Sequence, residues 1–262
     1  MLEKQIREQI ISLINREVVP AVGCTEPMCV SLCVAKATET LGCRPEKITA
    51  LLSANILKNA MGVGIPGTGM IGLPIAIALG ALVGKSEYQL EVIKDLTRET
   101  LEEGKQYVSE DHIDIKLKQG ITEKLYVEIR CEAQGHEATA IIAHSHTNIV
   151  YVERDGNAIL DRRTPQAGAA EQKDIQLNMR MVYDFAMTTP EEEINFILKT
   201  RDYNIRAAEE SKKANYGHCL GKTIDRPLSH GIFGNSIFSH IISKTASACD
   251  ARMGGAMIPV MS

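Results

Sequence analysis

Cys24 is the residue whose local setting most favours chemistry. It lies between two segments with the hydrophobic spacing of helices, directly after Gly23. Pro20 ends the first segment, and Thr25 is expected to cap the second, with Pro27 in its first turn. A cysteine just outside a helix N-terminus faces unpaired N–H groups and the positive end of the helix dipole, which favour the thiolate. The thiolate is both a nucleophile and a metal ligand; the alternative is a small buried thiol in a tight turn.

A glycine-rich stretch forms a second candidate site. Four glycines between residues 62 and 69 predict a loop that enters a helix at about 70–83. Such a loop can turn backbone N–H groups toward a carboxylate or a phosphate. It lacks the Gly-Lys-Ser/Thr ending of a Walker loop, and it follows a predicted helix rather than the strand that a dinucleotide site requires. The alternative is tight helix packing at glycine.

Lys58 precedes this loop, at the end of an apolar segment predicted to be helical. An amine in that position could pair with a substrate carboxylate or form a Schiff base. It could equally be a cation at a helix C-terminus with no further role.

The remaining cysteines and histidines offer weaker signals. Cys29 and Cys33 share a helix face and are expected in the core, because metal motifs use shorter spacings such as Cys-x-x-Cys. His144 and His146 would lie on one face of a predicted strand. They could form a metal pair, but no third ligand is near, and histidines at a sheet surface are the favoured interpretation.

These residues are positioned by a chain with two kinds of periodicity. Helical spacing predicts helices over residues 3–16, 26–41, 45–59, 70–83 and 89–107, of which 26–41 is apolar all round and therefore central. Gly42 is the expected residue after the end of that helix. Alternating residues over 112–160 then predict an antiparallel meander, with turns at Gln134-Gly135 and Asp155-Gly156.

A polar loop is expected over residues 161–173, and helical patterns return at about 174–187, 190–214 and 229–249. The sequence therefore predicts an α+β protein. A mostly helical body, residues 1–110 and 165–262, would carry an antiparallel β insert at residues 111–164.

Composition narrows the class of protein. The 262 residues carry a net charge of −4 with a pI near 6.0, which favours neither nucleic acid nor an anionic membrane surface as a partner. The N-terminus is charged and amphipathic rather than a signal peptide, and the apolar run Met70–Val83 is too short to span a bilayer. The seven cysteines are odd in number and scattered, which indicates reduced thiols in a cytoplasm.

Four segments in order resemble the L-cysteine desulfidase family, which is related to the alpha part of iron–sulfur L-serine dehydratases. They cover essentially the whole chain: Val22-Gly23-Cys24-Thr25-Glu26-Pro27, Lys58-Asn59 with Gly64-Ile65-Pro66-Gly67-Thr68-Gly69, His146-Thr147-Asn148-Ile149-Val150, and Asp250-Ala251-Arg252-Met253-Gly254-Gly255.

The resemblance implies a [4Fe–4S] lyase that eliminates the β-substituent of an amino acid. L-cysteine would give sulfide, ammonia and pyruvate, and L-serine is the alternative substrate. Three cysteines hold the cluster in such enzymes, and one iron stays open as a Lewis acid. Cys24 matches the first ligand. The resemblance implies a substrate site built from the residues Thr25, Glu26, Lys58, Asn59, Gly67, Thr68 and Gly69.

The sequence departs from the family at its end. The other two ligands lie beyond the Asp-Ala-Arg-Met-Gly-Gly region, and Cys249 does not match a ligand position. A fragment, a truncated reading frame or one subunit of a split enzyme would explain this. The alternatives are an inactive or scaffolding subunit that needs a separate C-terminal chain and, with less support, a pyridoxal-phosphate lyase using Lys58. A homo-oligomer, or a partner that covers the apolar C-terminal end, is expected.

Overall fold

The structure is a computed structural model, and it describes residues 2–163, 175–226 and 236–261. Its first half contains α1 (Lys4–Glu17), β1 (Pro20–Val22), α2 (Thr25–Leu41), β2 (Lys47–Leu52), α3 (Ala54–Ala60), α4 (Leu73–Leu82), the 3-10 helix η1 (Ser86–Glu91) and α5 (Arg98–Ser109). The strands β3 (Ile113–Leu117), β4 (Tyr126–Ala133), β5 (His136–Ala143), β6 (Ile149–Arg154) and β7 (Asn157–Asp161) follow.

The second half is mostly helical. It contains α6 (Met179–Thr188), α7 (Glu191–Ile194), η2 (Asn195–Ile197), α8 (Leu198–Lys213), α9 (Leu220–Asp225), α11 (Ile237–Met253) and the short strand β8 (Pro259–Met261). The predicted α+β class is confirmed. The predicted loop at 161–173 and the start of the predicted helix at 229–249 lie largely outside the described residues.

Helix α2 is the centre of the main core, as its apolar composition predicted. Most of its side chains are buried, and it packs against both the sheet and α4. The Ser31 hydroxyl donates a hydrogen bond to the Ala76 carbonyl oxygen at 2.7 Å. A Cβ atom at Gly80 would lie 2.7 Å from the Ser31 carbonyl oxygen, so glycine permits this close helix contact. Gly42 ends the helix with a φ of 84°, as expected.

The large sheet has the strand order β3-β2-β4-β5-β6-β7. Strands β4 to β7 form the predicted antiparallel meander, and the two predicted turns are present. Gln134, Gly135, Asp155 and Gly156 all have positive φ values between 50° and 79°, which suits two-residue hairpin turns. Strand β3 departs from the meander, because it pairs in parallel with β2 rather than with β4.

The predicted helix at residues 45–59 is wrong over its first part and right only from Ala54 onward. Residues 47–52 form β2, with Ile48, Ala50 and Leu52 buried on one face, and α3 begins only after Ser53. A short apolar run does not distinguish a strand from a buried helix. Pairing with β3 and β4 on both sides decides the outcome. The sheet therefore takes one strand from outside residues 111–164, and the division into a helical body and a β insert stays a prediction.

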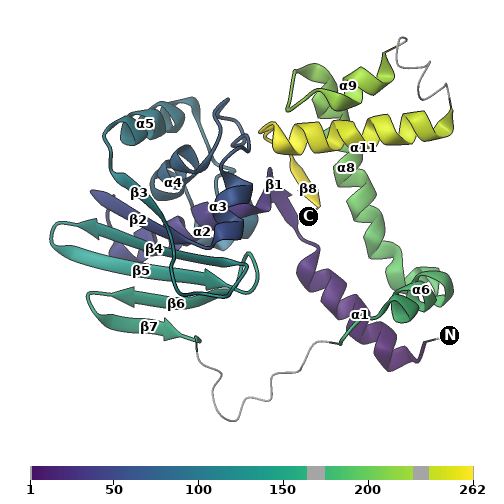
Figure 1. The fold of residues 1–262 in the computed structure, drawn as a ribbon, viewed down its shortest axis with the longest axis horizontal. Coiled ribbons are helices and arrows are strands. Elements are labelled where there is room, and N and C mark those ends of the chain that lie inside the picture. The colour runs from purple at the N-terminus through teal and green to yellow at the C-terminus, as the bar shows by residue number, and fades with distance from the viewer. Residues whose placement is uncertain (1, 164–174, 227–235, 262) are drawn as a thin grey trace.

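The second half of the chain also differs in detail from the prediction. The single helix expected over 190–214 is divided into α7, η2 and α8. Figure 1 shows α1, α6, α8 and α11 set apart from the sheet, with β1 and β8 between the two groups. These two strands pair antiparallel, Ala21 with Val260, and so join the start of the described chain to its end.

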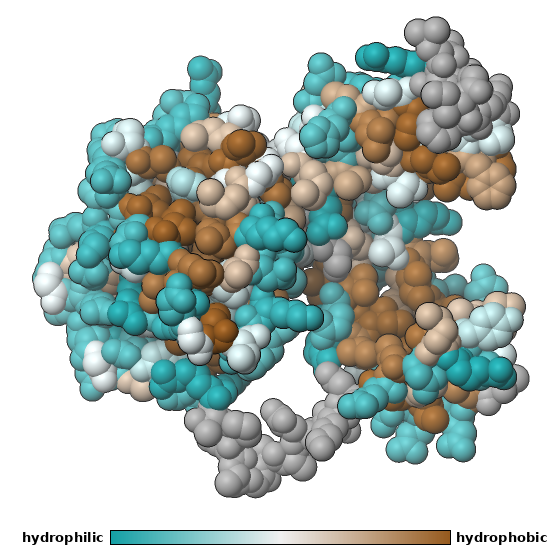
Figure 2. All heavy atoms as spheres, in the orientation of Figure 1, coloured by the Kyte–Doolittle hydropathy of each residue, from teal (hydrophilic) through white to brown (hydrophobic). Residues whose placement is uncertain are grey.

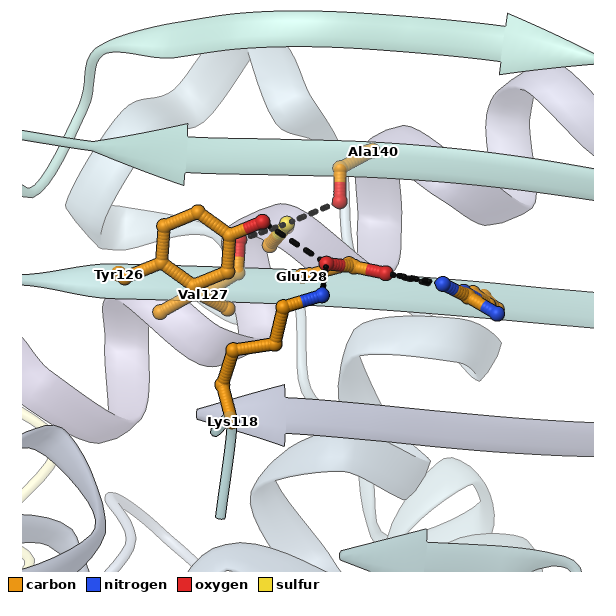
Figure 3. Close-up of polar contacts among 7 residues, drawn as sticks. Lys118, Tyr126, Val127, Glu128 and Ala140 are labelled. Carbon is orange, nitrogen blue, oxygen red and sulfur yellow. Dashed lines mark hydrogen bonds and ion pairs between the residues drawn. The ribbon is translucent and has the colours of Figure 1, made fainter. Parts of the chain in front are cut away.

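The two faces of the sheet carry different chemistry (Figure 3). On the α2 side, the Cys33 thiol donates to the carbonyl oxygens of Val127 and Ala140 at 3.7 and 3.3 Å. The Glu128 carboxylate lies on the opposite face, with 4% of its side chain exposed. It accepts hydrogen bonds from Lys118 Nζ and the Tyr126 hydroxyl at 2.6 and 2.8 Å, and from the Arg130 guanidinium at 2.6 Å.

Two further features bear on the cysteines and on membrane association. All seven cysteines are free thiols in the structure. Within the ranges that the structure describes, no helix is long and apolar enough to cross a membrane.

We predict that Glu128→Gln destabilises the fold at neutral pH by about 1–3 kcal/mol, because Lys118 and Arg130 lose a charged partner. Burial tends to raise the pKa of Glu128, but its hydrogen bonds outweigh burial and the net pKa is lowered. The stabilisation is therefore complete above the unfolded pKa of about 4.3 and is lost as the pH falls through the folded pKa.

Urea unfolding of both proteins between pH 3 and 8 measures this effect. The difference in unfolding free energy should shrink at the acidic end. Glu132→Gln is the matched control, since Glu132 lies on the same strand with about half of its side chain exposed, 3.6 Å from Lys47. An equal effect of both substitutions would contradict the prediction.

Candidate functional site

Cys24 is the residue that caps α2. Its φ and ψ of −82° and 138° are those of an N-cap, and its backbone carbonyl accepts from the Met28 amide at 3.4 Å. Thr25, which the sequence predicted as the cap, is instead the first residue of the helix. Cys24 is therefore the N-cap itself rather than the residue before it. Its residue is 5% exposed, so the sulfur is nearly enclosed.

Glu26 connects the polar groups around this thiol. Its Oε2 atom accepts from Cys24 Sγ at 2.9 Å and from Thr25 Oγ1 at 3.1 Å. Its Oε1 atom accepts a hydrogen bond from Nδ2 of Asn59, a residue of α3, at 3.2 Å. Four of the predicted site residues therefore form one hydrogen-bonded group, which we call the Glu26 group: Cys24, Thr25, Glu26 and Asn59.

The electrostatics of this group favour the neutral thiol of Cys24. Burial and, after it, the hydrogen bond from the thiol to the Glu26 carboxylate together raise the pKa of Cys24 to about 11. Burial also acts to raise the pKa of Glu26, but the hydrogen bonds it accepts outweigh burial and lower it. The predicted thiolate at the helix N-terminus is therefore wrong, because burial and a neighbouring carboxylate outweigh the helix dipole.

His146 lies beside this group. It occupies the turn between β5 and β6, whereas the sequence placed it on a strand face with His144. Asn148 closes the turn through a hydrogen bond from its Nδ2 atom to the Ala143 carbonyl at 3.0 Å. His146 and Thr25 line the same small cavity of about 240 Å³. Burial lowers the pKa of the imidazole, with a smaller opposing effect from Glu26.

Arg252 brings a positive charge to the same region from the last turn of α11. Its charge acts to lower the pKa values of both Cys24 and His146. Its carbonyl oxygen lies 3.9 Å from where a Cβ atom at Gly23 would be. His146 and Arg252 were not assigned a role from the sequence, although both lie in segments that carry the family resemblance. Only their proximity in space singles them out.

The glycine-rich loop is held against the end of α11. The Gly64 amide donates to the Met253 carbonyl at 2.9 Å, and the Gly67 amide donates to the Gly255 carbonyl at 3.0 Å. A Cβ atom at Gly64 would lie 2.6 Å from the carbonyl carbon of Gly254. The contact is therefore one of backbone against backbone, and the tight-packing interpretation of these glycines is supported at Gly64.

Gly23 links the Cys24 segment to the same loop. It has a φ of 77°, and a Cβ atom there would lie 2.6 Å from Pro66 Cγ. Both the conformation and the contact require glycine. The two motifs that start the resemblance are thus in direct contact.

Several amides of the loop are already used inside the protein. The Thr68 amide donates to the Ile65 carbonyl at 3.2 Å, and the Thr68 hydroxyl donates to that same oxygen at 2.7 Å. With the Gly67 amide also engaged, fewer N–H groups remain to meet an anion than the glycine count suggested. Gly69 differs, because the space around it is open. Substrate binding by Gly67, Thr68 and Gly69 stays a prediction.

A cleft of about 940 Å³ opens between this loop and the second half of the chain. Gly67 and Gly69 line it on one side, and His218 and Asp250 line it on the other. The Asp250 carboxylate is buried and accepts from the Gly221 amide at 2.9 Å, which fixes the start of α9 against α11. The cleft is large enough to admit an amino acid.

Lys58 stands apart from the Glu26 group. It occupies the last turn of α3, is exposed, and makes no hydrogen bond or ion pair with any described residue. A Schiff-base lysine is normally activated by burial or by a neighbouring cation. The Lys58 side chain is exposed to solvent instead. The structure thus brings Asn59 to the site but leaves its neighbour Lys58 at the surface.

The described residues do not form a [4Fe–4S] site on their own. Among them, no group of three His, Cys, Asp or Glu side chains could hold a metal ion. Cys29 and Cys33 are fully buried in the α2 core, as predicted, and are not available to join Cys24. Cys24 is the one suitably placed thiol among the described residues. To bind a cluster, it would have to lose the proton with which it donates a hydrogen bond to Glu26.

We predict that Gly64→Ala destabilises the protein by about 1–3 kcal/mol, because its methyl group would collide with the Gly254 backbone. Gly62→Ala is the matched control in the same loop, since nothing lies within 4 Å of its Cβ position. Thermal unfolding measures both. A Gly64 variant as stable as the Gly62 variant would show that the loop does not depend on this contact.

We also predict that Cys24 is alkylated slowly by iodoacetamide at pH 8, since its pKa is about 11. Glu26→Gln should speed the reaction roughly tenfold, because a shift of one pKa unit changes the thiolate fraction tenfold. Peptide mass spectrometry resolves each cysteine, and the exposed Cys249 is the internal control. Unchanged Cys24 labelling in the variant would mean that burial alone controls the thiol.

Over 263 residues, the chain is 63% identical to a UPF0597 protein of Phocaeicola vulgatus, and the matched region covers 100% of this chain and 61% of the relative. It is 61% identical over 256 residues to a UPF0597 protein of Bacteroides fragilis, covering 98% of this chain and 60% of the relative. A UPF0597 protein of Bacteroides thetaiotaomicron is 58% identical over 262 residues, with 100% and 61% covered.

No protein-family model matches the chain, and no solved structure matches it. The names of the relatives state no activity, so the resemblance to L-cysteine desulfidases stays a prediction. The chain spans about three-fifths of the length of these curated relatives. Along its whole length, the chain is therefore similar to proteins of the UPF0597 family.

Proposed function

We propose that this chain is the part of an iron–sulfur β-eliminating amino-acid lyase that contributes Cys24 and the polar groups around it. The supporting observation is the convergence of all four segments that carry the resemblance. Glu26 bonds Cys24 and Asn59, His146 shares a cavity with Thr25, and the end of α11 holds the glycine loop. Segments up to 230 residues apart in sequence thus meet at one place.

The proposed reaction converts L-cysteine and water into sulfide, ammonia and pyruvate, or L-serine into ammonia and pyruvate. In either case a base removes the α-proton and the β-substituent leaves with its electron pair. The resulting aminoacrylate is then hydrolysed. The further cluster ligands belong, in this proposal, to the two-fifths of the relatives' length that the chain does not span.

His146 is the candidate base. Its lowered pKa keeps the imidazole neutral at neutral pH, which is the form that can accept a proton. The backbone turn closed by Asn148 fixes its position. Glu26 is a less suitable base, because its lowered pKa makes it a weak proton acceptor and its oxygens already receive three hydrogen bonds.

The substrate carboxylate needs a cation, and Arg252 is the candidate from this structure. A guanidinium suits a carboxylate through two parallel hydrogen bonds. Lys58 and Gly69 remain further proposed contacts of the amino acid, Lys58 from the surface of α3 and Gly69 from the open part of the loop. The size of the 940 Å³ cleft beside Gly69 is compatible with that role.

A second candidate is a scaffolding subunit without a cluster of its own. The single suitably placed thiol among the described residues favours it. A pyridoxal-phosphate lyase using Lys58 has no comparable support, because Lys58 is exposed.

The test joins the remaining part of the Phocaeicola vulgatus relative to residue 262 and reconstitutes the product anaerobically with iron and sulfide. We expect cluster absorbance and pyruvate formation from L-cysteine or L-serine. Cys24→Ser should lose both, because the first ligand is removed. Cys43→Ser is the matched control and should retain both, since this half-buried cysteine lines neither the cleft nor the cavity beside Thr25 and has no partner at ligand spacing.

His146→Asn separates chemistry from assembly in the same experiment. It should keep the iron content and lose at least about a hundredfold in pyruvate formation, as expected for a general base. Normal iron content and turnover in Cys24→Ser would overturn the lyase proposal. A folded product with neither cluster nor pyruvate would favour the scaffolding subunit.

A further inference from the structure

The second half of the chain exposes an unusual amount of apolar surface. Of the nineteen large hydrophobic side chains exposed in the described residues, fifteen lie between Leu177 and Met257. Figure 2 shows apolar side chains gathered over the part of the molecule formed by α1, α6, α8 and α11. The remaining four of the nineteen lie in the part of the chain that forms the large sheet and its helices: Met61, Ile71, Leu117 and Ile159. A surface of this kind marks a site of association.

A groove between α8 and α11 is the best-formed part of this surface. It has a volume of about 570 Å³, and strand β8 contributes to its lining. Ala208 and Val260 are buried in it, with 5% and 2% of each residue exposed. Ile205 and Ile241 stand at its sides with 43% and 54% exposed. The groove therefore has an apolar lining on two helices and a strand.

Positive charges surround the same groove. The described residues that line it include Arg201, Lys244 and Arg252, and none of them is an Asp or a Glu. Arg201 is paired with the neighbouring Asp202 at 3.0 Å, so its charge is partly compensated. The whole chain has a net charge of −4, so the cationic lining of this groove differs in sign from the average charge of the protein. An occupant should be apolar along one side and acidic at its flanks.

We infer that this groove is the docking site for the polypeptide segment that makes up the remaining two-fifths of the relatives' length. Curated relatives about 60% identical to this chain are longer by that amount. An amphipathic helix with acidic flanks fits a groove between two helices, in the helix-in-groove mode of recognition. The inference does not depend on the reaction, and it holds whether the segment is continuous with the chain or separate.

Docking there would also place the segment near the Glu26 group. Arg252 lines the groove and, through its charge, acts on Cys24 and His146. Cys249, one turn earlier on α11, lies in both the groove and the larger cleft beside the glycine loop. A segment in the groove therefore lies next to the residues that any completed site would use.

The test co-expresses this chain with the remaining segment of the Phocaeicola vulgatus relative as a separate, tagged polypeptide. We expect a stable one-to-one complex by light scattering, with slower amide exchange in α8 and α11. Ile241→Asp should weaken binding at least tenfold, since it places a charge in the apolar lining. Ile159→Asp is the matched control: Ile159 is 66% exposed, lies on β7 and should leave binding unchanged.

A charge reversal tests whether the positive charges of the groove contribute to binding the segment. Lys244→Glu should weaken binding about tenfold at low salt and less at high salt. Lys105→Glu, on α5 outside the groove, should have no effect on binding. Ile159, Ile241 and Lys244 are exposed, and the Lys105 side chain is 41% exposed, so none of the four substitutions falls in the core. Circular dichroism establishes that each variant is folded.

Three outcomes would overturn the inference. The first is a combined result: the separate segment forms no complex with this chain, and a protein in which the segment is joined to residue 262 folds but leaves the amides of the groove unprotected from exchange. The second is a complex that Ile241→Asp does not weaken. The third is a dimer of this chain alone that Ile241→Asp dissociates, which would assign the groove to a second copy. None of these readouts uses enzyme activity, so failure here is distinct from failure of the lyase proposal.

Discussion

The backbone contact between the glycine loop and the end of α11 is the constraint on which the candidate site depends. Gly64 lies so close to the Gly254 backbone that its position has no room for a Cβ atom, and a Cβ atom at Gly254 would collide with Gly217 and Tyr216 on its other side. Hydrogen bonds from Gly64 to Met253 and from Gly67 to Gly255 hold the contact. Because the loop also touches Gly23 through Pro66, this contact brings Arg252 to the region of Cys24. The site exists only where both halves of the chain meet.

Within that frame, Glu26 sets the chemical state of the thiol. One carboxylate accepts hydrogen bonds from Cys24, Thr25 and the Asn59 amide. Cys24 and Thr25 are buried, whereas Glu26 and Asn59 are half-buried. The result is a carboxylate with a lowered pKa beside a thiol with a raised one. Binding of iron to Cys24 would release the thiol proton, so metal affinity and the protonation of this group are physically coupled.

The second half of the chain has a different balance of forces. Around α2 the apolar residues are almost completely enclosed, and the helix packs on a six-stranded sheet. Around α8 and α11 the buried cluster is small, consisting of Ala207, Ala251, Ala256 and Val260. Small side chains bring α8, α11 and β8 close together, but they bury little apolar area. The larger residues of these helices face outward, which is consistent with a surface shaped for another polypeptide.

The sequence determined the local features of this protein. Helix α2 with its closing Gly42, the hairpin turns at Gln134-Gly135 and Asp155-Gly156, and Cys24 at a helix N-terminus all follow from nearby residues. Tertiary structure decided the rest. Strand β2 depends on partners more than 60 residues away, and its apolar run fits a helix equally well. Burial and a carboxylate reversed the expected state of Cys24, and the proximity of His146 and Arg252 exists only in the folded chain. Turns and caps are short-range effects, whereas strand pairing, burial and charge depend on residues distant in sequence.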